Sequence, residues 1–327
     1  MTRMIAPSFI GSPLVDSRRL VQDGPGALKP WRPHAFPIFD ELAGPVNGVG
    51  PAGEGNRCLG YGTPVSTAGR DEPHVEVCQV GLRFGAREVF RDLNCEFPRG
   101  GISIVMGGSG SGKSTLLRTI GGLQRPDSGQ VTVAGDAVTG GSQAEVYRAR
   151  RRLGMLFQNG ALLDSMTIRD NVALPLREHT HRSEEDIEEM VRRRLASVGL
   201  EGVEDLLPGE LSGGMLRRAA LARAIIMDPQ IVLCDEPFSG LDPPNVARIE
   251  ALLVSLNRER GLTLIVSSHH IASSLRMADQ LVLLQDGVAI SGSPDRLAQS
   301  ANPRISDFLG PDGRAHAARL GEAGDSP

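Results

Sequence analysis

The chain has 327 residues, a formal net charge of −4 and a sequence pI near 6.0, values that exclude the basic footprint of a general nucleic-acid-binding protein. Hydrophobic residues make up 40% and charged residues 23%, which is ordinary for a globular protein with a sizeable core. The longest apolar runs fall far short of the roughly 20 residues that a membrane-spanning helix needs, so we expect a soluble cytoplasmic protein.

Residues 1–72 differ in composition from the rest of the chain. Glycine and proline together approach the roughly 25–30% that marks low-complexity sequence, so we predict a disordered extension. Within it, residues 29–42 (KPWRPHAFPIFDEL) concentrate the only tryptophan and several apolar side chains between prolines. Such a stretch is typical of a docking motif that folds on a partner. A solvated tail, or a start codon placed too far upstream, are the alternatives.

After this extension the sequence shows the periodicity of strands. Residues 75–84 (VEVCQVGLRF) and 88–97 (EVFRDLNCEF) alternate partly between apolar and polar residues, which predicts a small antiparallel sheet. The runs at residues 102–106, 231–234 and 262–266 are continuously apolar and separated by helical stretches, which indicates a parallel sheet with crossover helices. The predicted fold class is therefore α/β, with a mostly parallel core sheet and an antiparallel β-subdomain.

A mostly helical block lies between these strands, over about residues 159–215. In SEEDIEEMVRRRLASVGL, Ser183 and the acids after it combine a capping residue with charges that complement a helix N-terminus. The block predicts a helical insertion into the α/β fold. From Pro311 the small and polar residues predict a flexible C-terminal tail (311–327), which leaves residues 73–310 as the folded domain.

The cysteines are Cys58, Cys78, Cys95 and Cys234. Because they show neither CxxC spacing nor a companion histidine cluster, we expect neither a disulfide framework nor a zinc site, but thiols in a reducing compartment.

The segment GGSGSGKST fits the phosphate-loop pattern G-x-x-x-x-G-K-[ST] and lies between a predicted strand and a predicted helix. Its glycines let backbone amides wrap phosphates without a conflict at Cβ. Lys113 reaches the β- and γ-phosphates, and the Ser114 hydroxyl ligates Mg²⁺. The predicted nucleotide-binding residues in this loop are Gly107, Gly108, Ser109, Gly110, Ser111, Gly112, Lys113, Ser114 and Thr115.

Polar side chains follow the other predicted core strands. Asp235 and Glu236 end the run IVLCDE, and the carboxyl ends of parallel strands border the ligand crevice. Asp235 suits the shell of Mg²⁺, and Glu236 suits a general base that activates water. His269, after LTLIVSS, is placed to touch a γ-phosphate, although a lone histidine is more often structural. Gln158 is placed to sense Mg²⁺ or the attacking water. For Asp235 and Glu236 the alternative is that two acids merely end a strand at the surface.

A second phosphate cradle is predicted in ELSGGMLRRAALARAI (residues 210–225). Ser212, Gly213 and Gly214 begin a helix whose free amides and positive dipole end favour an anion. Because one ATP already has its phosphates held by Lys113 and its loop, this cradle is explained if it faces the ATP of another subunit. We therefore expect a head-to-tail homodimer that sandwiches two ATPs. A glycine-containing helix start without a ligand is the alternative.

In this order the motifs resemble those of the ABC-transporter ATPases, over roughly residues 75–309. The resemblance implies the Q-loop at Gln158, the LSGGQ-like signature at residues 211–215, the D-loop SGLD ending at Asp242, and the switch histidine at His269. Phe84 matches the aromatic that stacks on adenine, where many members have tyrosine, and His270 stands where many have aspartate. The catalytic residues implied for ATP hydrolysis are Glu236, His269, Gln158 and Lys113, and those implied for the metal are Ser114, Gln158 and Asp235.

Residues 155–180 and 210–225 further resemble the ATPase subunit of the Mla (maintenance of lipid asymmetry) phospholipid transporters, which share methionine at the position of Met215. The resemblance implies a membrane permease that contacts residues 159–180, lipid-binding partner proteins, and a place on the cytoplasmic face of the inner membrane. Three alternatives remain open: an ABC ATPase for another hydrophobic substrate, a soluble ABC protein in assembly or regulation, and a nucleotide-binding scaffold without hydrolysis.

Overall fold

The computed structural model describes residues 73–324, with side chains described through residue 320. The predicted extension over residues 1–72, with its docking motif at residues 29–42, lies outside the described residues, as do residues 325–327.

The helices and strands follow one another in this order: β1 (Pro73–Phe84), β2 (Arg87–Pro98), β3 (Ile102–Met106), α1 (Lys113–Ile120), β4 (Ser128–Val133), β5 (Asp136–Ala137), α2 (Gln143–Arg151), β6 (Leu153–Leu156), α3 (Ile168–His179), α4 (Glu184–Ser197), the 3₁₀ helix η2 (Pro208–Glu210), α5 (Gly213–Ile225), β7 (Ile231–Asp235), α6 (Pro243–Arg260), β8 (Thr263–Ser267), α7 (Ile271–Met277), β9 (Gln280–Gln285), β10 (Val288–Gly292), α8 (Pro294–Ala298) and α9 (Pro303–Gly324).

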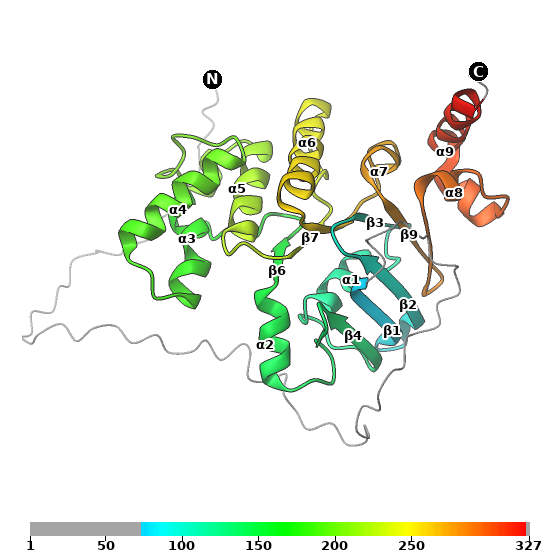
Figure 1. Cartoon of the computed structure of the whole chain (residues 1–327), viewed down its shortest axis with the longest axis horizontal. Coiled ribbons are helices and arrows are strands. Elements are labelled where there is room, and N and C mark those ends of the chain that lie inside the picture. The colour runs from blue at the N-terminus through cyan, green and yellow to red at the C-terminus, as the bar shows by residue number, and fades with distance from the viewer. Residues whose placement is uncertain (1–72, 325–327) are drawn as a thin grey trace, which may run out of the picture. The chain divides into compact units, whose positions relative to one another are not determined.

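Two sheets organise these elements (Figure 1). A four-stranded antiparallel sheet has the order β2-β1-β4-β5, and a six-stranded sheet has the order β10-β9-β3-β8-β7-β6. In the second sheet the strands from β9 to β6 are parallel, and only the edge strand β10 is antiparallel. The predicted fold class, a mostly parallel core sheet with an antiparallel β-subdomain, is confirmed.

The core sheet is covered on both faces, which explains why its central strands are apolar throughout. Every residue of β3, β7 and β8 is buried. Because successive side chains of a strand point to opposite faces, Ile104 packs into the apolar cluster shared with helices α3 to α7. Its neighbour Val105 packs into the other cluster, shared with α1 and the antiparallel sheet.

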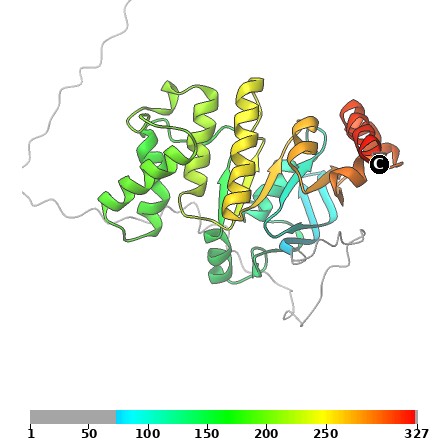
Figure 2. The same ribbon diagram turned by 45° about the horizontal axis from the view of Figure 1, so that its top comes forward.

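The helices α3, α4 and α5 pack on one another and form a group of their own between β6 and β7 in sequence (Figures 1 and 2). The predicted cap is confirmed, because the Ser183 side chain accepts a hydrogen bond from the Asp186 amide at the start of α4. Thr167 caps α3 through the Asp170 amide in the same way.

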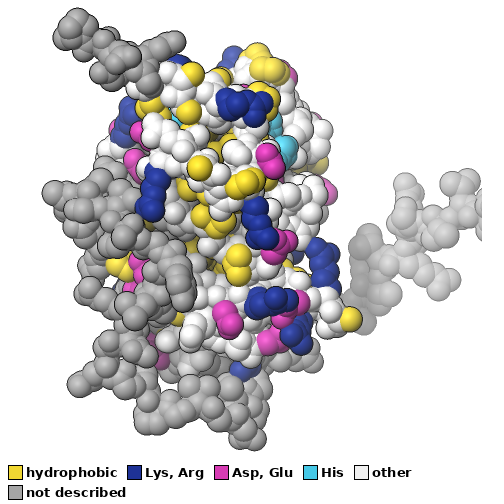
Figure 3. All heavy atoms as spheres, turned by 90° about the vertical axis from the view of Figure 1, so that its right-hand side faces the viewer, with side chains coloured by type: hydrophobic (Ala, Val, Ile, Leu, Met, Phe, Trp, Pro, Cys, Tyr) yellow, Lys and Arg dark blue, Asp and Glu magenta, His cyan; other side chains and the backbone are white. Residues whose placement is uncertain are grey.

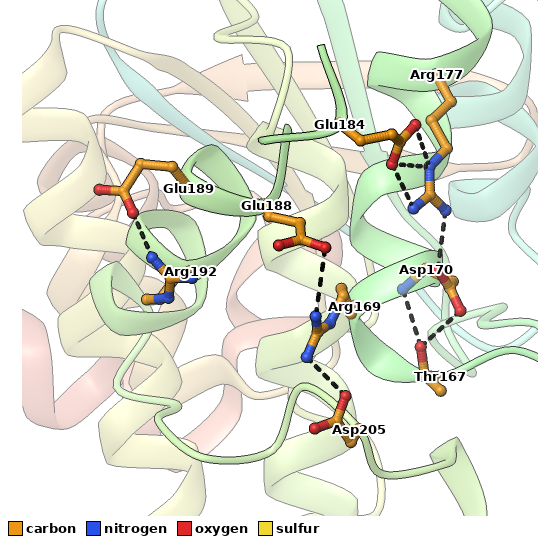
Figure 4. A network of polar contacts seen from close by, with 9 residues as sticks. All are labelled: Thr167, Arg169, Asp170, Arg177, Glu184, Glu188, Glu189, Arg192 and Asp205. Atoms are coloured by element: carbon orange, nitrogen blue, oxygen red, sulfur yellow. Dashed lines mark hydrogen bonds and ion pairs between the residues drawn. The ribbon is translucent and has the colours of Figure 1, made fainter. Parts of the chain in front are cut away.

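A network of ion pairs ties α3 to the chain around it (Figure 4). Arg177 bridges Asp170 and Glu184 at the turn into α4, with nitrogen–oxygen distances of 2.9 Å to each carboxylate. The hydrogen bond from Arg177, followed by that from Thr167, lowers the pKa of Asp170. Exposed ion pairs of this kind each contribute little to the free energy of unfolding, so the network orients α3 more than it stabilises the fold.

The C-terminal residues differ from the predicted tail, because α9 continues as a helix to Gly324. The helix is kinked at Gly310, whose positive φ of 52° precedes Pro311, and its first part buries Ile305 and Leu309. After the kink, His316 lies 2.7 Å from Asp295 of α8. Alanines in this stretch favour a helix, a propensity that the small and polar composition obscured.

The cysteine expectation is correct for Cys95 and Cys234, which are buried free thiols. Burial raises the pKa of both thiols to about 12, so neither is a reactive thiolate. It is wrong at Cys78, which is disulfide-bonded. Spacing along the sequence does not reveal which cysteines a fold brings together.

None of the helices within residues 73–324 is long and apolar enough to cross a bilayer. On the face drawn in Figure 3, basic and acidic side chains of the described residues are interspersed with scattered apolar ones. This face therefore lacks the single-sign stripe with which proteins bind nucleic acid.

The loop before α3 depends on one buried amide, that of Asn171. Its Oδ1 accepts from the Leu163 amide at 2.7 Å, and its Nδ2 donates to the carbonyls of Leu163, Met166 and Thr167 at 3.0 Å each. We predict that Asn171→Ala lowers the free energy of unfolding by about 2–3 kcal/mol, because buried backbone groups lose their partner. Chemical denaturation measures this, and Asn159→Ala, at an exposed position of the same segment, is the control. Equal stability of the two variants would contradict the prediction.

Candidate functional site

The phosphate loop connects β3 to α1, as the sequence predicts (Figure 1). Gly112 caps α1 with a φ of 101°, in the left-handed region that favours glycine. A Cβ at this position would lie 2.6 Å from the ring of Phe90 and 2.9 Å from Val89. Side chains of the antiparallel sheet thus pack closely against the loop, and only a glycine fits at position 112, where the loop joins the helix.

Lys113 extends back over the loop that it follows. Its Nζ donates to the carbonyls of Gly107 at 2.9 Å and Gly108 at 3.3 Å, and lies 3.7 Å from Oε1 of Glu236. The ammonium therefore stands between the loop and the predicted general base. A cation in this place is suited to the charge of a bound triphosphate.

Asp235 ends β7 almost completely buried, with 1% of its surface exposed. Two hydroxyls donate to its Oδ1 at 2.8 Å each, Ser114 Oγ from the phosphate loop and Ser267 Oγ from the end of β8. The Ser267 hydroxyl also accepts from the Glu236 amide at 2.9 Å. The loop and two strands are joined at this carboxylate.

Glu236 follows directly, with a positive φ of 47° that is uncommon for a residue other than glycine. Its Oε2 lies 2.7 Å from Nδ1 of His269, whose side chain is exposed, while the carboxylate itself is largely buried. Glu236 is thus flanked by Lys113 on one side and His269 on the other. A carboxylate held this way is placed to accept a proton from a water that enters beside the histidine.

The donors around Asp235 fit a magnesium ion. Within residues 73–324 no group of three or more His, Cys, Asp or Glu residues is able to hold a metal. Ser114 and Asp235 instead offer the hard oxygen ligands that Mg²⁺ prefers, in the small number that is usual when phosphates and waters complete its shell.

A cavity of about 650 Å³ opens beside the phosphate loop. Its walls come from β2, the phosphate loop, the turn between β9 and β10, and α9, and include Val89, Ser109, Ser111, Gln285 and Phe308. Ser111 Oγ and Gln285 Oε1 are buried there without a hydrogen-bond partner. The size is ordinary for a small-molecule site.

The remaining predicted residues are exposed or cap helices of their own. Phe84 ends β1 with 50% of its surface exposed, and Gln158 is exposed in the loop after β6. Ser212 and Asp242 are exposed and cap their own helices, α5 and α6. Among the residues that the structure describes, no hydrogen bond or ion pair joins Ser212, Gly213 or Gly214 to the phosphate loop.

The start of α5 nevertheless has the form of an anion cradle. The Ser212 side chain accepts from the Met215 amide, which leaves the amides of Gly213 and Gly214 without a helical partner. A Cβ at Gly214 would lie 2.7 Å from the Asn245 side chain, so a glycine is needed there, whereas a Cβ at Gly213 would make an ordinary contact, 3.8 Å from the Leu241 side chain. Met215 packs against the apolar core, which explains why its side chain does not disturb the cradle.

Sequence reasoning missed Ser267 and Arg217. Ser267 lies beside Asp235 in the parallel register of β7 and β8, and the serine at the end of LTLIVS was its only signal. Arg217, on α5, donates to the carbonyls of Phe157 and Ser239, contacts for which the sequence carries no signal.

Comparisons with known proteins agree with this geometry. A model of the family described as ABC transporter matches residues 90–239. The ATP-binding protein MlaF of the intermembrane phospholipid transport system of Haemophilus influenzae is 43% identical over 236 residues, which cover 72% of this chain and 89% of that protein.

The chain belongs to the ABC transporter family. The MlaF protein of Escherichia coli strain K12 is 42% identical over 236 residues, covering 72% of this chain and 88% of that protein. The probable ribonucleotide transport ATP-binding protein mkl of Mycobacterium tuberculosis strain H37Rv is 38% identical over 261 residues, covering 76% of this chain and 73% of that protein.

Solved structures support the same family. The dimeric bacterial ABC transporter cassette MJ0796 superposes with a TM-score of 0.62 at 31% identity, covering 67% of this chain and 98% of that one. The same cassette is also known as a dimer in a post-hydrolysis state with ADP and Pi. The matched family and relatives are ATP-binding subunits of ABC transporters, so this chain binds and hydrolyses ATP.

We predict that Glu236→Gln binds ATP but loses turnover by about 10²–10⁴-fold, because the amide cannot take a proton from water. Steady-state phosphate release measures turnover, and equilibrium binding of ATP measures affinity. Glu201→Gln, an exposed carboxylate outside the site, serves as the control and should match the parent in both. Turnover near the parental value in Glu236→Gln would remove Glu236 from this role.

Proposed function

We propose that the chain is the ATP-hydrolysing subunit of an ABC transporter that energises phospholipid movement between the inner and outer membranes through a separate permease. The observation that carries this proposal is the 42–43% identity to two MlaF proteins over 88–89% of their lengths, together with the joined site around Asp235 and Glu236.

In the proposed reaction the chain's own residues hold and orient the substrate. Lys113 and the loop amides bind the phosphates of ATP, while Ser114 and Asp235, with Gln158 from its loop, hold Mg²⁺, which neutralises charge on the phosphates when bound. Glu236 accepts the proton of the attacking water. His269, 2.7 Å from that carboxylate, orients it and would contact the γ-phosphate of bound ATP.

The proposed active unit is a head-to-tail homodimer. Ser212, Gly213 and Asp242 are exposed and unattached to the phosphate loop of their own chain, and the amides at the start of α5 suit an anion. These features are accounted for if each signature helix meets the ATP of the other subunit, with adenine stacked on the exposed ring of Phe84. The dimeric state of the MJ0796 cassette supports this arrangement.

The proposed contact with the permease lies in residues 159–180. Leu163 in this segment is 45% exposed and Leu207 is 42% exposed. The backbone bond from Ile168 to Leu206 brings the two regions together at the start of α3. Exposed leucines beside a helix held by ion pairs suit an apolar partner helix. In this proposal the subunit lies on the cytoplasmic face of the inner membrane, and lipid-binding proteins act beyond the permease.

The domain division remains part of the proposal. We assign residues 73–310 to the nucleotide-binding domain, with the helical subdomain over about residues 159–215, and residues 1–72 to an extension outside it. The described residues all fall within one compact unit, although α9 carries that unit beyond residue 310.

A second candidate is ribonucleotide transport. The alignment with mkl is longer, 261 residues against 236, and mkl bears that function in its name. We prefer phospholipid because the identity to MlaF is higher and spans more of the relative.

The test is capture of the tagged full-length chain from detergent-solubilised membranes, followed by mass spectrometry of proteins and lipids. We expect a multi-span permease, a lipid-binding partner and enriched phospholipid. Capture of a permease without phospholipid, together with ribonucleotide-stimulated ATPase activity, would favour the second candidate. Recovery of the chain alone would contradict transport.

The permease contact has a test of its own. We predict that Leu163→Asp reduces the captured permease at least about tenfold, because a charge placed in an apolar contact must be desolvated. Leu123→Asp is the matched control, since Leu123 is 39% exposed but lies outside the segment. Thermal unfolding checks that both variants are folded. Equal capture by the two variants would place the permease elsewhere.

A further inference from the structure

The helix α5 carries arginines that bind backbone carbonyls of two catalytic loops. Arg217 donates from Nη1 to the carbonyl of Phe157 at 3.4 Å and from Nη2 to the carbonyl of Ser239 at 3.1 Å. Phe157 directly precedes Gln158, and Ser239 begins the D-loop. One guanidinium thus joins two loops that are far apart in sequence.

A second hydrogen bond connects Ser239 to Glu236, the proposed general base. The Ser239 amide donates to the Glu236 carbonyl at 3.2 Å, closing the turn after β7. Two hydrogen bonds therefore connect α5 to the backbone of Glu236, whose positive φ makes it dependent on its surroundings for its conformation. The side chain at position 217 is held against both loops at once.

Arg223, further along α5, secures the other side of Gln158. It donates to the carbonyls of Gly160 at 2.8 Å and Ala161 at 2.7 Å. Burial lowers the pKa of both Arg217 and Arg223, and within residues 73–324 neither forms an ion pair with a carboxylate. The hydrogen-bond acceptors of the two arginines are therefore backbone carbonyls of the loops and not carboxylates.

We infer that Arg217 is a positioning residue for ATP hydrolysis: it fixes Gln158 and Glu236 relative to α5, the helix that begins with the signature residues. Movement of the signature helix is thereby transmitted to the general base of the same chain. The inference rests on the proposed roles of Gln158 and Glu236.

The two contacts of Arg217 depend on the planar shape of its guanidinium group. Two acceptors on different loops require donors that diverge from one rigid group. A lysine donates from a single nitrogen, so it does not span acceptors on two separate loops as the two terminal nitrogens of an arginine do, and a methionine fills similar space without donating. The series Arg217, Lys, Met therefore removes first one loop contact and then both.

The adjacent Arg218 provides a matched control. It lies on the same helix and also donates to two backbone carbonyls, those of Val198 and Gly199 at the end of α4. These acceptors are remote from Gln158 and Glu236 in the sequence and belong to the packing of the helical group. Arg218→Met removes the same kind of contact without touching a catalytic loop.

The experiment measures kcat and KM for ATP hydrolysis by the full-length chain and its thermal unfolding midpoint. We expect Arg217→Met to lower kcat at least about tenfold with KM within about threefold, because misplaced catalytic groups slow the chemical step more than they weaken binding. Arg217→Lys should give an intermediate kcat. Arg218→Met should lower the unfolding midpoint with kcat near the parental value.

The inference is overturned if Arg217→Met keeps kcat within twofold of the parent, or if Arg217→Met and Arg218→Met lose kcat equally. If Arg217→Met does not fold, Arg217→Lys carries the test, and a parental kcat in that variant overturns the inference. Glu236→Gln and Gln158→Ala are measured alongside. Parental turnover in those two variants would show that the proposed catalytic roles themselves are wrong, whereas their loss beside an active Arg217→Met rejects only the role of Arg217.

Discussion

The buried carboxylate of Asp235 is the constraint on which the site depends. A carboxylate taken out of water must be compensated by hydrogen bonds or by a cation. Here, hydroxyls from two other segments, Ser114 and Ser267, supply them at one oxygen. Satisfying Asp235 therefore brings the phosphate loop, β7 and β8 to one point, and the same hydroxyl of Ser267 holds the Glu236 amide. The hydrogen bonds that compensate the buried carboxylate also bring together the groups to which we assign the binding of phosphate and the activation of water.

The second organising element is α5. Its first residues offer free amides to an anion, while arginines further along bind the carbonyls of the loops around Gln158 and Ser239. A helix is rigid along its axis, so its N-terminal end and its loop-binding side move together. The apolar residues of the same helix, among them Ala220 and Leu221, are buried in the core, and the site is thereby tied to the packing of the helical group.

The sequence predicted individual elements well where local signals were strong. The glycine loop, the apolar core strands and the Ser183 cap all lie where the motifs placed them. The continuation of α9 beyond residue 310 was missed because the small and polar composition of this stretch obscured the helix propensity of its alanines. The disulfide at Cys78 was missed because pairing is a property of distance in space.

By itself the sequence determined the phosphate-loop motif of this protein, the carboxylates that follow its core strands, and the family to which the order of the motifs belongs. Such features are carried by side-chain type at fixed spacing, and a chain displays them before it folds. Only the tertiary structure decided how these residues are held, through Ser267 beside Asp235 and Arg217 between the loops at Phe157 and Ser239. The acceptors of Arg217 are backbone carbonyls, which every residue possesses, so no residue type in the sequence marks them.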